Sequence, residues 1–531
     1  MADIPQRKKD ILVYGAWPDP RSSGISSVVH DTIKGMNEEG YNVYLITRNY
    51  NDPNPTSIDL MEIPGDRPFD WQETVKAPKK YSSFPDLIKK DSETKKRDGD
   101  SLLSRIGIIH SHFDDLIPNP NENERSPNNY QVLADYITRA SGERPKLVRT
   151  RHDETHEGID RLNRLTGLDW ERLSPDVRES YLKDGTPLKD IVRDYVSQHR
   201  NEMKQKYRLD DLYLDNAIDH VWYALHQLRL WQREADDFDT IINHTRQDAD
   251  ETKRLGIAGE QNYHKFFPIH NGSSFSPKDM DKINGLLEEY HHNGGLECYR
   301  AGDDAKEKIY FSPEDKKMIF VGRANSSKGS YELAQSLANL RKKGIKNIKG
   351  IFVGGGFDAR ARRELEALDP ENARDYLLFT GRVEDPDVLA SIYSFGNATV
   401  IPSHYECFNL VGVESLKLGK PLIVTNFSGP GEIYIKHPEK YGIRIALPVD
   451  KPHKEGPDRY YGVDLDSLES RIREITTDDA LAAELGERGK QFVEEHYSHH
   501  LMGKRYAELF SSLMGNIRQI SAKPQKSHAK L

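Results

Sequence analysis

The sequence is poor in cysteine and lacks long hydrophobic runs. Among its 531 residues only Cys298 and Cys407 are cysteines, far apart and without the spacing of a metal-binding motif. This excludes a disulfide framework and fits a reducing compartment. The amino terminus passes from charged residues directly into an apolar segment without a signal-peptide pattern, and no run of about 18 apolar residues occurs. We therefore expect a cytoplasmic protein without a transmembrane segment.

The chain also lacks an excess of positive charge. Its formal net charge is −9, with 30% charged and 36% hydrophobic residues. No overall basic field is available to attract nucleic acid or an anionic membrane, and we expect no nucleic-acid partner. A chain of 531 residues is too long for one ordinary domain and ample for two substantial cores.

The stretch Asn397–Glu432 is the most informative part of the sequence. Its apolar run Ala398 to Ile401 predicts a buried parallel strand, a polar loop follows, and the apolar spacing from Leu410 predicts a helix that Gly419 ends. A second strand is expected directly afterwards. In such units, ligands bind beyond the carboxyl ends of the strands, where helix N-termini present free N–H groups. The backbone amides expected to face an anionic ligand there are those of Phe408, Asn409 and Leu410.

Two carboxylates flank these amides. Glu406 lies in the loop before the predicted helix, and Glu414 follows about two turns along it. Carboxylates accept hydrogen bonds from sugar hydroxyls well, and this spacing lets the pair hold two hydroxyl-bearing parts of one ligand. Any two glutamates at this spacing are more often solvated surface groups, so the surrounding sequence has to decide.

These surroundings resemble the donor-site segment of family 4 retaining glycosyltransferases. The shared features are Glu-x7-Glu with Cys-Phe-Asn after the first glutamate, a helix ending Leu-Gly-Lys-Pro, and a later Ser-Gly-Pro-Gly-Glu. The resemblance implies that Glu406 contacts the transferred sugar and that Glu414 contacts the nucleotide ribose. Most members have glycine where this chain has Asn409. If that position needs a positive φ, asparagine accepts it better than most residues.

The first third of the chain resembles the opening of the same family. Ile11–Gly15 and Tyr41–Thr47 are predicted strands, and between them Gly24 precedes a helix to about Glu39, where the backbone could approach a phosphate. The phrase Lys146–His152 is similar to the family's strand followed by its active-site histidine. The resemblance therefore places His152 beside the donor sugar and its phosphate.

A competing interpretation concerns His110 and His112. Two histidines separated by one residue at a strand end could be metal ligands, as in metal-dependent hydrolases. Such a site needs further ligands from other strand ends. We expect no metal in the site, and this hydrolase is kept as an alternative.

Two polar stretches interrupt the first half and have no family counterpart. Residues 49–100 are rich in proline, aspartate and lysine, and we expect a mobile insertion. Residues 157–217 carry apolar residues at helical spacing and predict two or three amphipathic helices. Both insertions are expected to serve acceptor recognition. Further along, Asp219–Tyr223 is interpreted as a strand that precedes a helix to about Glu234.

The second half repeats the alternation of strand and helix. After the strand Met318–Val321, Arg323 and Lys328 bring two cations to a helix N-terminus, which suits a diphosphate. By resemblance they neutralise the departing nucleotide. The family places the nucleobase beside the turn that includes Arg382 and Val383. The last helix, from about His500 to Ile517, is expected to cross back onto the first domain, and the tail from Ser521 to be disordered.

The sequence thus predicts an α/β protein with two Rossmann-like, doubly wound domains facing across a cleft, the GT-B fold. The expected division is an N-terminal domain 1–275, a nucleotide-sugar domain 276–499 and a C-terminal helix and tail 500–531. The resemblance implies a retaining glycosyltransferase that uses a nucleotide-diphosphate sugar as donor substrate, with front-face transfer and no cofactor or metal. A sugar-phosphate phosphorylase or epimerase on the same fold, and a non-catalytic partner subunit, stay open. The donor base, the sugar, the acceptor and the oligomeric state are not determined by the sequence.

Overall fold

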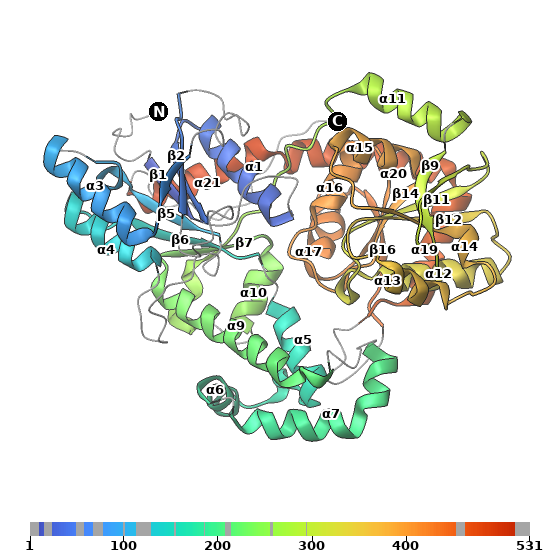
Figure 1. The fold of residues 1–531 in the computed structure, drawn as a ribbon, viewed down its shortest axis with the longest axis horizontal. Helices are drawn as coiled ribbons and strands as arrows, with labels where there is room; N and C mark the ends of the chain where they lie inside the picture. Colours follow the sequence, from blue (N-terminus) through green and yellow to red (C-terminus); the bar gives the residue numbers. More distant parts are fainter. Residues whose placement is uncertain are drawn as a thin grey trace. The chain divides into compact units, whose positions relative to one another are not determined.

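The chain forms two compact units. Unit 1 comprises Met1–Arg151, Asp237–Ile242 and His499–Leu531, and unit 2 comprises His152–Asp236 and Asn243–Ser498. Each contains a sheet with helices packed on it (Figure 1). The domain limits expected from the sequence divide the chain differently and stay a prediction. The computed structural model describes residues 10–14, 24–48, 58–66, 78–98, 101–112, 129–152, 155–184, 186–207, 214–254, 259–293, 295–452 and 462–515.

Unit 1 is built on a sheet whose strands run in the order β4-β3-β2-β1-β5-β6-β7. The central strands are parallel, and β3 and β4 add to one edge in antiparallel pairing. The order reverses between β1 and β5, as in doubly wound folds. The strands are β1 (Asp10–Tyr14), β2 (Asn42–Arg48), β3 (Ile58–Ile63), β4 (Lys79–Tyr81), β5 (Ile108–Ser111), β6 (Lys146–Thr150) and β7 (Thr240–Asn243).

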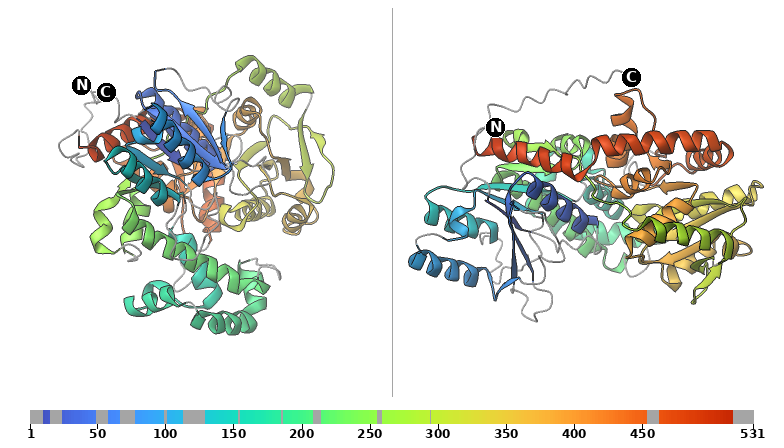
Figure 2. Two further views of the ribbon diagram at one scale, coloured as in Figure 1. Left: turned by 60° about the vertical axis from the view of Figure 1, so that its left-hand side comes forward. Right: turned by 90° about the horizontal axis from the view of Figure 1, so that it is seen from above.

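The last helix of the chain packs along the first. Helix α1 (Gly24–Glu38) and helix α21 (His499–Leu513) approach so closely that a Cβ on Gly35 would lie 2.7 Å from the Cα of Gly503 (Figure 2). Two glycines at the crossing allow this backbone contact. The remaining helices of the unit are α3 (Phe84–Asp98) and α4 (Asn129–Ser141), with a 3-10 turn at Leu103–Arg105.

The expectation of a mobile insertion over residues 49–100 is wrong for its described part. That part holds β3, β4 and α3, and the highly charged residues 89–98 lie within α3. Leu87 is buried, and the carboxylate of Asp91 accepts hydrogen bonds from Ser101 Oγ (2.7 Å) and Tyr136 Oη (3.0 Å). A few inward contacts are enough to order a helix whose other faces are charged, which composition alone does not reveal.

Unit 2 contains a second sheet, in the order β10-β9-β13-β12-β11-β14-β15-β16. From β13 to β16 the neighbours are parallel, while β9 and β10 form an antiparallel hairpin at one edge that the sequence did not predict. Here the order reverses between β11 and β14. The strands are β9 (Leu296–Arg300), β10 (Glu307–Ile309), β11 (Lys316–Val321), β12 (Ile348–Val353), β13 (Leu377–Gly381), β14 (Ala398–Ile401), β15 (Leu422–Thr425) and β16 (Ala446–Val449).

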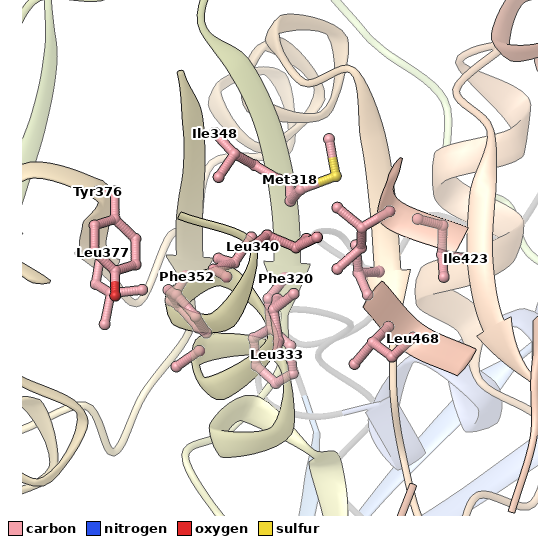
Figure 3. Close-up of a cluster of buried hydrophobic side chains, with 14 of the residues drawn as sticks. Met318, Phe320, Leu333, Leu340, Ile348, Phe352, Tyr376, Leu377, Ile423 and Leu468 are labelled. Carbon is pink, nitrogen blue, oxygen red and sulfur yellow. The ribbon is translucent and has the colours of Figure 1, made fainter. Parts of the chain in front are cut away.

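The core of this sheet explains the apolar runs in the sequence. Met318 and Phe320 from β11 and Phe352 from β12 are buried against Leu333 of one covering helix and Leu468 of another (Figure 3). Because a parallel strand is buried on both faces, its residues are apolar without alternation. The helices are α12 (Ser330–Lys342), α13 (Ala359–Glu366), α14 (Ala373–Tyr376), α15 (Pro386–Phe395), α16 (Leu410–Lys417), α17 (Ser428–Pro430), α18 (His437–Glu439), α19 (Leu465–Thr477) and α20 (Asp479–His496).

The described part of 157–217 is helical, as predicted, and it continues into a further long helix. The elements are α5 (Thr155–Thr166), α6 (Pro175–Lys183), α7 (Thr186–Tyr207) and α9 (Ala217–Asp237), which share a core of their own. The strand expected at Asp219–Tyr223 is wrong, because Val221, Leu225 and Leu228 face that core at helical spacing. The strand lies later, at β7, whose four residues are all buried.

The remaining elements of unit 2 lie in the chain between α9 and the second sheet or follow β15. It includes α10 (Arg246–Arg254), β8 (Phe266–Pro268), α11 (Met280–Glu288) and a π-helical segment, η7 (Gly431–Lys436). Among the described residues, no helix combines the length and the apolar character needed to cross a membrane. The tail expected to be disordered, from Ser521, lies outside the described residues, and the cytoplasmic location stays a prediction.

Candidate functional site

The site forms where the strand order of unit 2 reverses. Strands β11 and β14 pair in parallel, so the loops that follow them leave the sheet side by side. The amide of His404 donates to the carbonyl of Ser327 (2.7 Å), which ties the two loops together. Gly329 has φ +72°, and a Cβ there would lie 2.0 Å from the carbonyl oxygen of Pro402. Only glycine fits at that contact, because any side chain would overlap the backbone of the other loop. Gly329 therefore allows the two loop backbones to pack directly on each other.

The two loops bring Lys328 and Glu406 together as an ion pair. The Lys328 ammonium contacts Glu406 Oε1, and the two side chains are 23% and 15% exposed. The same oxygen accepts hydrogen bonds from Asn409 Nδ2 (3.1 Å) and Ser403 Oγ (3.4 Å). The cation expected to bind phosphate and the carboxylate expected to bind sugar thus form an ion pair with each other. A ligand that takes both must bring charge for the lysine and hydroxyls for the glutamate.

Asn409 sets the start of the next helix. It has φ +73° and is, within the described ranges, the one non-glycine residue with positive φ. Its side chain accepts a hydrogen bond from the amide of Gly412 (3.1 Å) and so caps α16, while its carbonyl accepts from the Tyr434 hydroxyl. The departure from the family's glycine is therefore tolerated for the reason given from the sequence. It also adds a donor for Glu406, which a glycine could not supply.

We expect Asn409→Ala to lower the free energy of unfolding and Asn409→Gly to change it little. Alanine meets the left-handed strain and loses the cap, together about 1–3 kcal/mol, whereas glycine accepts this φ and costs a few tenths as a cap. Both variants remove the amide that contacts Glu406, so their difference isolates the backbone. Urea unfolding of the two variants measures it, and equal stabilities would contradict the strain argument.

Glu414 is hydrogen-bonded by a buried tyrosine. The Tyr393 hydroxyl, from α15, donates to Glu414 Oε2 (3.0 Å). Burial, together with the nearby Glu414 carboxylate, raises the pKa of Tyr393 well above its usual value, so the hydroxyl stays protonated and remains a donor. Because Glu406 precedes α16 and Glu414 lies on it, the helix separates the two carboxylates as the spacing predicted.

The other residues predicted for the second half lie along the same edge of the sheet. Arg323 follows β11, is exposed, and makes no hydrogen bond or ion pair through its guanidinium with the part of the chain that the structure describes. Arg382 follows β13, two strands away, and lies 3.4 Å from Glu384 at the surface. Val383 is partly buried against the core. Phe408 is buried and Leu410 partly so, both at the start of α16.

His152 lies beside the Glu406 loop within unit 2. Its carbonyl accepts a hydrogen bond from Cys407 Sγ (2.9 Å), and its Nδ1 is 3.1 Å from Nε2 of His244. Burial lowers the pKa of His244 to about 3, so this neighbour is neutral near pH 7. The structure thus brings His152 to the residue next to Glu406. Gly24 begins α1 in unit 1, and its predicted role as a phosphate-approaching glycine stays a prediction.

His110 is part of the core of unit 1. Its Nε2 is 2.7 Å from Thr150 Oγ1, its ring packs on Tyr506, and burial lowers its pKa to about 3. Within the described residues, one group of three possible metal ligands lies close enough together, Glu38, His499 and His500, and it includes neither His110 nor His112. The surroundings of the two predicted ligands are those of packed core histidines, which weakens the hydrolase interpretation.

One acidic residue was missed by the sequence interpretation. Glu432 accepts hydrogen bonds from the amides of Arg246 (3.0 Å) and Gln247 (2.6 Å) and pairs with His270 (3.0 Å). Burial alone would raise the pKa of Glu432, but His270 and the two amides together hold it below its usual value. The Ser-Gly-Pro-Gly-Glu motif contained the signal, although the partners come from distant segments that no local pattern connects to it.

Comparison with known proteins identifies the same part of the chain. Residues 302–444 match the family model described as Glycosyl transferases group 1. The chain is 24% identical over 256 residues to the capsular polysaccharide biosynthesis glycosyltransferase CapM of Staphylococcus aureus, covering 47% of this chain and 54% of that protein. It is 28% identical over 214 residues to a D-inositol 3-phosphate glycosyltransferase of Rhodococcus jostii, covering 39% and 44%. The matches therefore span about half the length of these curated relatives.

Solved structures resemble nearly the whole chain. A sucrose-phosphate synthase from Thermosynechococcus elongatus superposes with a TM-score of 0.53 at 17% identity, covering 96% of this chain and 99% of that one. The catalytic domain of starch synthase IV from Arabidopsis thaliana, bound to ADP and acarbose, gives 0.53 at 12% identity, covering 95% and 99%. At such identities the likeness establishes the fold. The chain has the GT-B fold, which confirms the predicted fold class, and the narrower assignment to family 4 stays a prediction.

Proposed function

We propose that this chain is a retaining glycosyltransferase that transfers a sugar from a nucleotide-diphosphate sugar to an acceptor nucleophile without a metal ion. The observation that carries the proposal is the Lys328–Glu406 pair at the reversal of the strand order, with Glu414 on α16, the helix that follows Glu406. The cation and the two carboxylates then match three parts of such a donor, namely the diphosphate, the sugar and the ribose. The match of residues 302–444 to the glycosyltransferase model covers all three.

In this proposal, each side chain has one task. Arg323 and Lys328 bind the diphosphate and stabilise the charge that grows on it as the glycosidic bond breaks. The α16 N-terminus adds backbone donors through Phe408, Asn409 and Leu410. The bond from the anomeric carbon to the leaving phosphate breaks while the acceptor oxygen bonds to the same face of that carbon, and the acceptor's proton passes to the departing phosphate oxygen. The configuration is therefore retained and no enzyme nucleophile is needed.

The remaining assignments follow the resemblance. Glu406 orients the sugar hydroxyls, Glu414 orients the ribose, and Arg382 and Val383 border the nucleobase. His152 is proposed to contact the sugar and its phosphate, since its neighbour Cys407 adjoins Glu406. Anabaena HepE, whose structure contains UDP and glucose, has a TM-score of 0.51 with this chain at 12% identity and covers 95% of it, so a protein of similar fold binds a nucleoside diphosphate and a sugar.

The test is a donor screen with the purified 531-residue chain. UDP-, ADP- and GDP-linked hexoses are incubated with and without simple saccharide acceptors, and released nucleoside diphosphate is measured. We expect turnover with one base, a product of retained anomeric configuration by NMR, and the same rate in EDTA. Phosphate-dependent turnover without an acceptor would indicate the phosphorylase alternative. Loss of activity in EDTA with recovery in Mg²⁺ would contradict metal independence.

A further inference from the structure

Glu432 lies where three segments of unit 2 meet. It is on η7, directly after α17, with its side chain 13% exposed. Its two oxygens accept hydrogen bonds from the first two backbone amides of α10, and one of them also lies within hydrogen-bond distance of the ring of His270. The N-terminus of α10 and the imidazole thus bind the same carboxylate. A negative charge at a helix N-terminus is stabilising, and the low pKa of Glu432 keeps it ionised at neutral pH.

On one side, this residue is linked to Glu406. Helix α17 immediately precedes it, and there the amide of Gly429 donates to the carbonyl of Glu406 (2.8 Å). A Cβ on Gly429 would lie 2.2 Å from the carbonyl oxygen of Cys407. The loop that carries Glu432 is therefore packed, backbone against backbone, on the loop that carries Glu406. A shift of one requires a shift of the other.

On the other side, Glu432 is linked to His152. Helix α10 begins two residues after His244, whose ring contacts the ring of His152. The segment before His270 is tied to the same strand end, since the amide of Ile269 donates to the carbonyl of Asn243 (2.9 Å). All three groups bound by Glu432 thus belong to the two segments next to His244. The hydrogen bond from Cys407 Sγ to the His152 carbonyl connects His152 directly to the loop of Glu406, so the contacts that start at Glu432 form a closed ring.

We propose that Glu432 is a positioning residue that fixes His152 relative to Glu406, and so sets the geometry of the reacting sugar. The proposal rests on the proposed function for its catalytic consequence. Within the described residues, Glu432 makes its hydrogen bonds with Arg246, Gln247 and His270 and none with Arg323, Lys328 or Glu414, the side chains assigned to the nucleotide. Its loss should therefore leave nucleotide binding intact. A group that only stabilised the fold would affect nucleotide binding and turnover alike.

Glu432→Gln is the informative substitution. It keeps the size of the side chain but replaces one acceptor oxygen with an amide group that donates. Because all three partners are expected to donate to the carboxylate, at least one of them then faces another donor, and the local arrangement must shift. Glu439→Gln, at an exposed glutamate on nearby α18, is the matched control, since it removes the same charge without these contacts.

The experiment measures kcat and the donor KM, the Kd of the free nucleoside diphosphate by calorimetry, and the melting temperature. For Glu432→Gln we expect kcat to fall roughly ten- to a hundredfold, as misplacement of reacting groups by a fraction of an ångström does. The Kd of the nucleotide should stay within about twofold, since the phosphate and ribose contacts are untouched. Glu439→Gln should match the wild type in every quantity.

A second readout does not depend on activity. The ring resonances of His152, assigned by comparison with a His152→Gln variant, should move in Glu432→Gln and stay in place in Glu439→Gln. Unmoved His152 resonances would overturn the proposal, and so would a nucleotide Kd that weakens as much as kcat falls. If the wild type turns over no nucleotide sugar but its His152 signal still depends on Glu432, the proposed function fails while the positioning role stands.

Discussion

Glu406→Gln is expected to lower kcat roughly a hundredfold while free nucleoside diphosphate binds at least as tightly as to the wild type. Glu406 is assigned to the migrating sugar, which gains charge and changes position as the bond breaks. Removing its carboxylate therefore removes a contact that matters most in the transition state. The free nucleotide carries no transferred sugar, so its binding does not depend on the Glu406 contact.

The Lys328–Glu406 ion pair strengthens this expectation. The Lys328 ammonium contacts Glu406 in the structure, so a diphosphate bound by the lysine competes with that carboxylate. Glutamine at position 406 is neutral and holds the ammonium less strongly. Less free energy is then needed to separate Lys328 from residue 406 when the diphosphate binds. The affinity of the protein for the free nucleotide should therefore stay the same or increase.

Glu414→Gln should fail in the opposite way. Its contact is with the ribose, which hardly changes during the reaction, so its loss should weaken donor and free nucleotide alike, by about ten- to a hundredfold, and affect kcat little. Calorimetric titration of the nucleoside diphosphate into both variants, beside steady-state kinetics, separates the two. A Glu406→Gln protein that loses as much nucleotide affinity as Glu414→Gln would reverse or remove the assignment.

Arg323→Ala and Lys328→Ala are each expected to lower turnover near a hundredfold, about 3 kcal/mol in the transition state, with little change in stability. Neither side chain is part of a core. Arg323 is exposed, and Lys328 is partly so. After Lys328 is removed, Glu406 keeps the hydrogen bonds from Asn409 and Ser403, so no buried charge is left without donors.

A matched control is available on the same unit. Arg360 is exposed on α13 and pairs with Glu364 within its own helix, so Arg360→Ala removes a cation without touching the site. We expect wild-type kinetics for that variant. Full activity in Arg323→Ala or Lys328→Ala would remove that residue from the diphosphate site, and a large drop in melting temperature would reassign it to the fold.

Two parallel strands of unit 2, β11 and β14, could be predicted closely from the sequence, whereas the edge strands β9, β10 and β16 were not. Ala398–Ile401 was expected and is β14, because a short strand buried on both faces is a plain apolar run between turn residues. The same reasoning failed at Asp219–Tyr223, where Val221 and its neighbours also suit a helix, and only packing against α5 and α7 decides. The prediction also failed over residues 84–98, because the many charged residues of α3 obscure the pattern of its few buried ones.

The candidate site was predictable one residue at a time but not as an arrangement. Motif and strand end pointed to Lys328, Glu406 and Glu414, and the predicted strands place the first two in loops that follow strand ends. That Lys328 and Glu406 pair with each other depends on the order of β11 and β14 in the sheet, which the sequence does not specify. Glu432 was left without a role because its partners, at 246, 247 and 270, are far from it in the chain.

Helix α21 has a consequence for the order in which this protein can mature during synthesis. Tyr506 and Phe510 from this helix are fully buried in unit 1, where Tyr506 meets Thr150 Oγ1 at 3.1 Å and both rings pack on His110. Every residue of unit 2 leaves the ribosome before that helix does. Chains usually fold from the amino terminus as they emerge. Here the unit that is translated first has to wait, with its core open, until residues 499–513 arrive, so it is the last to be completed.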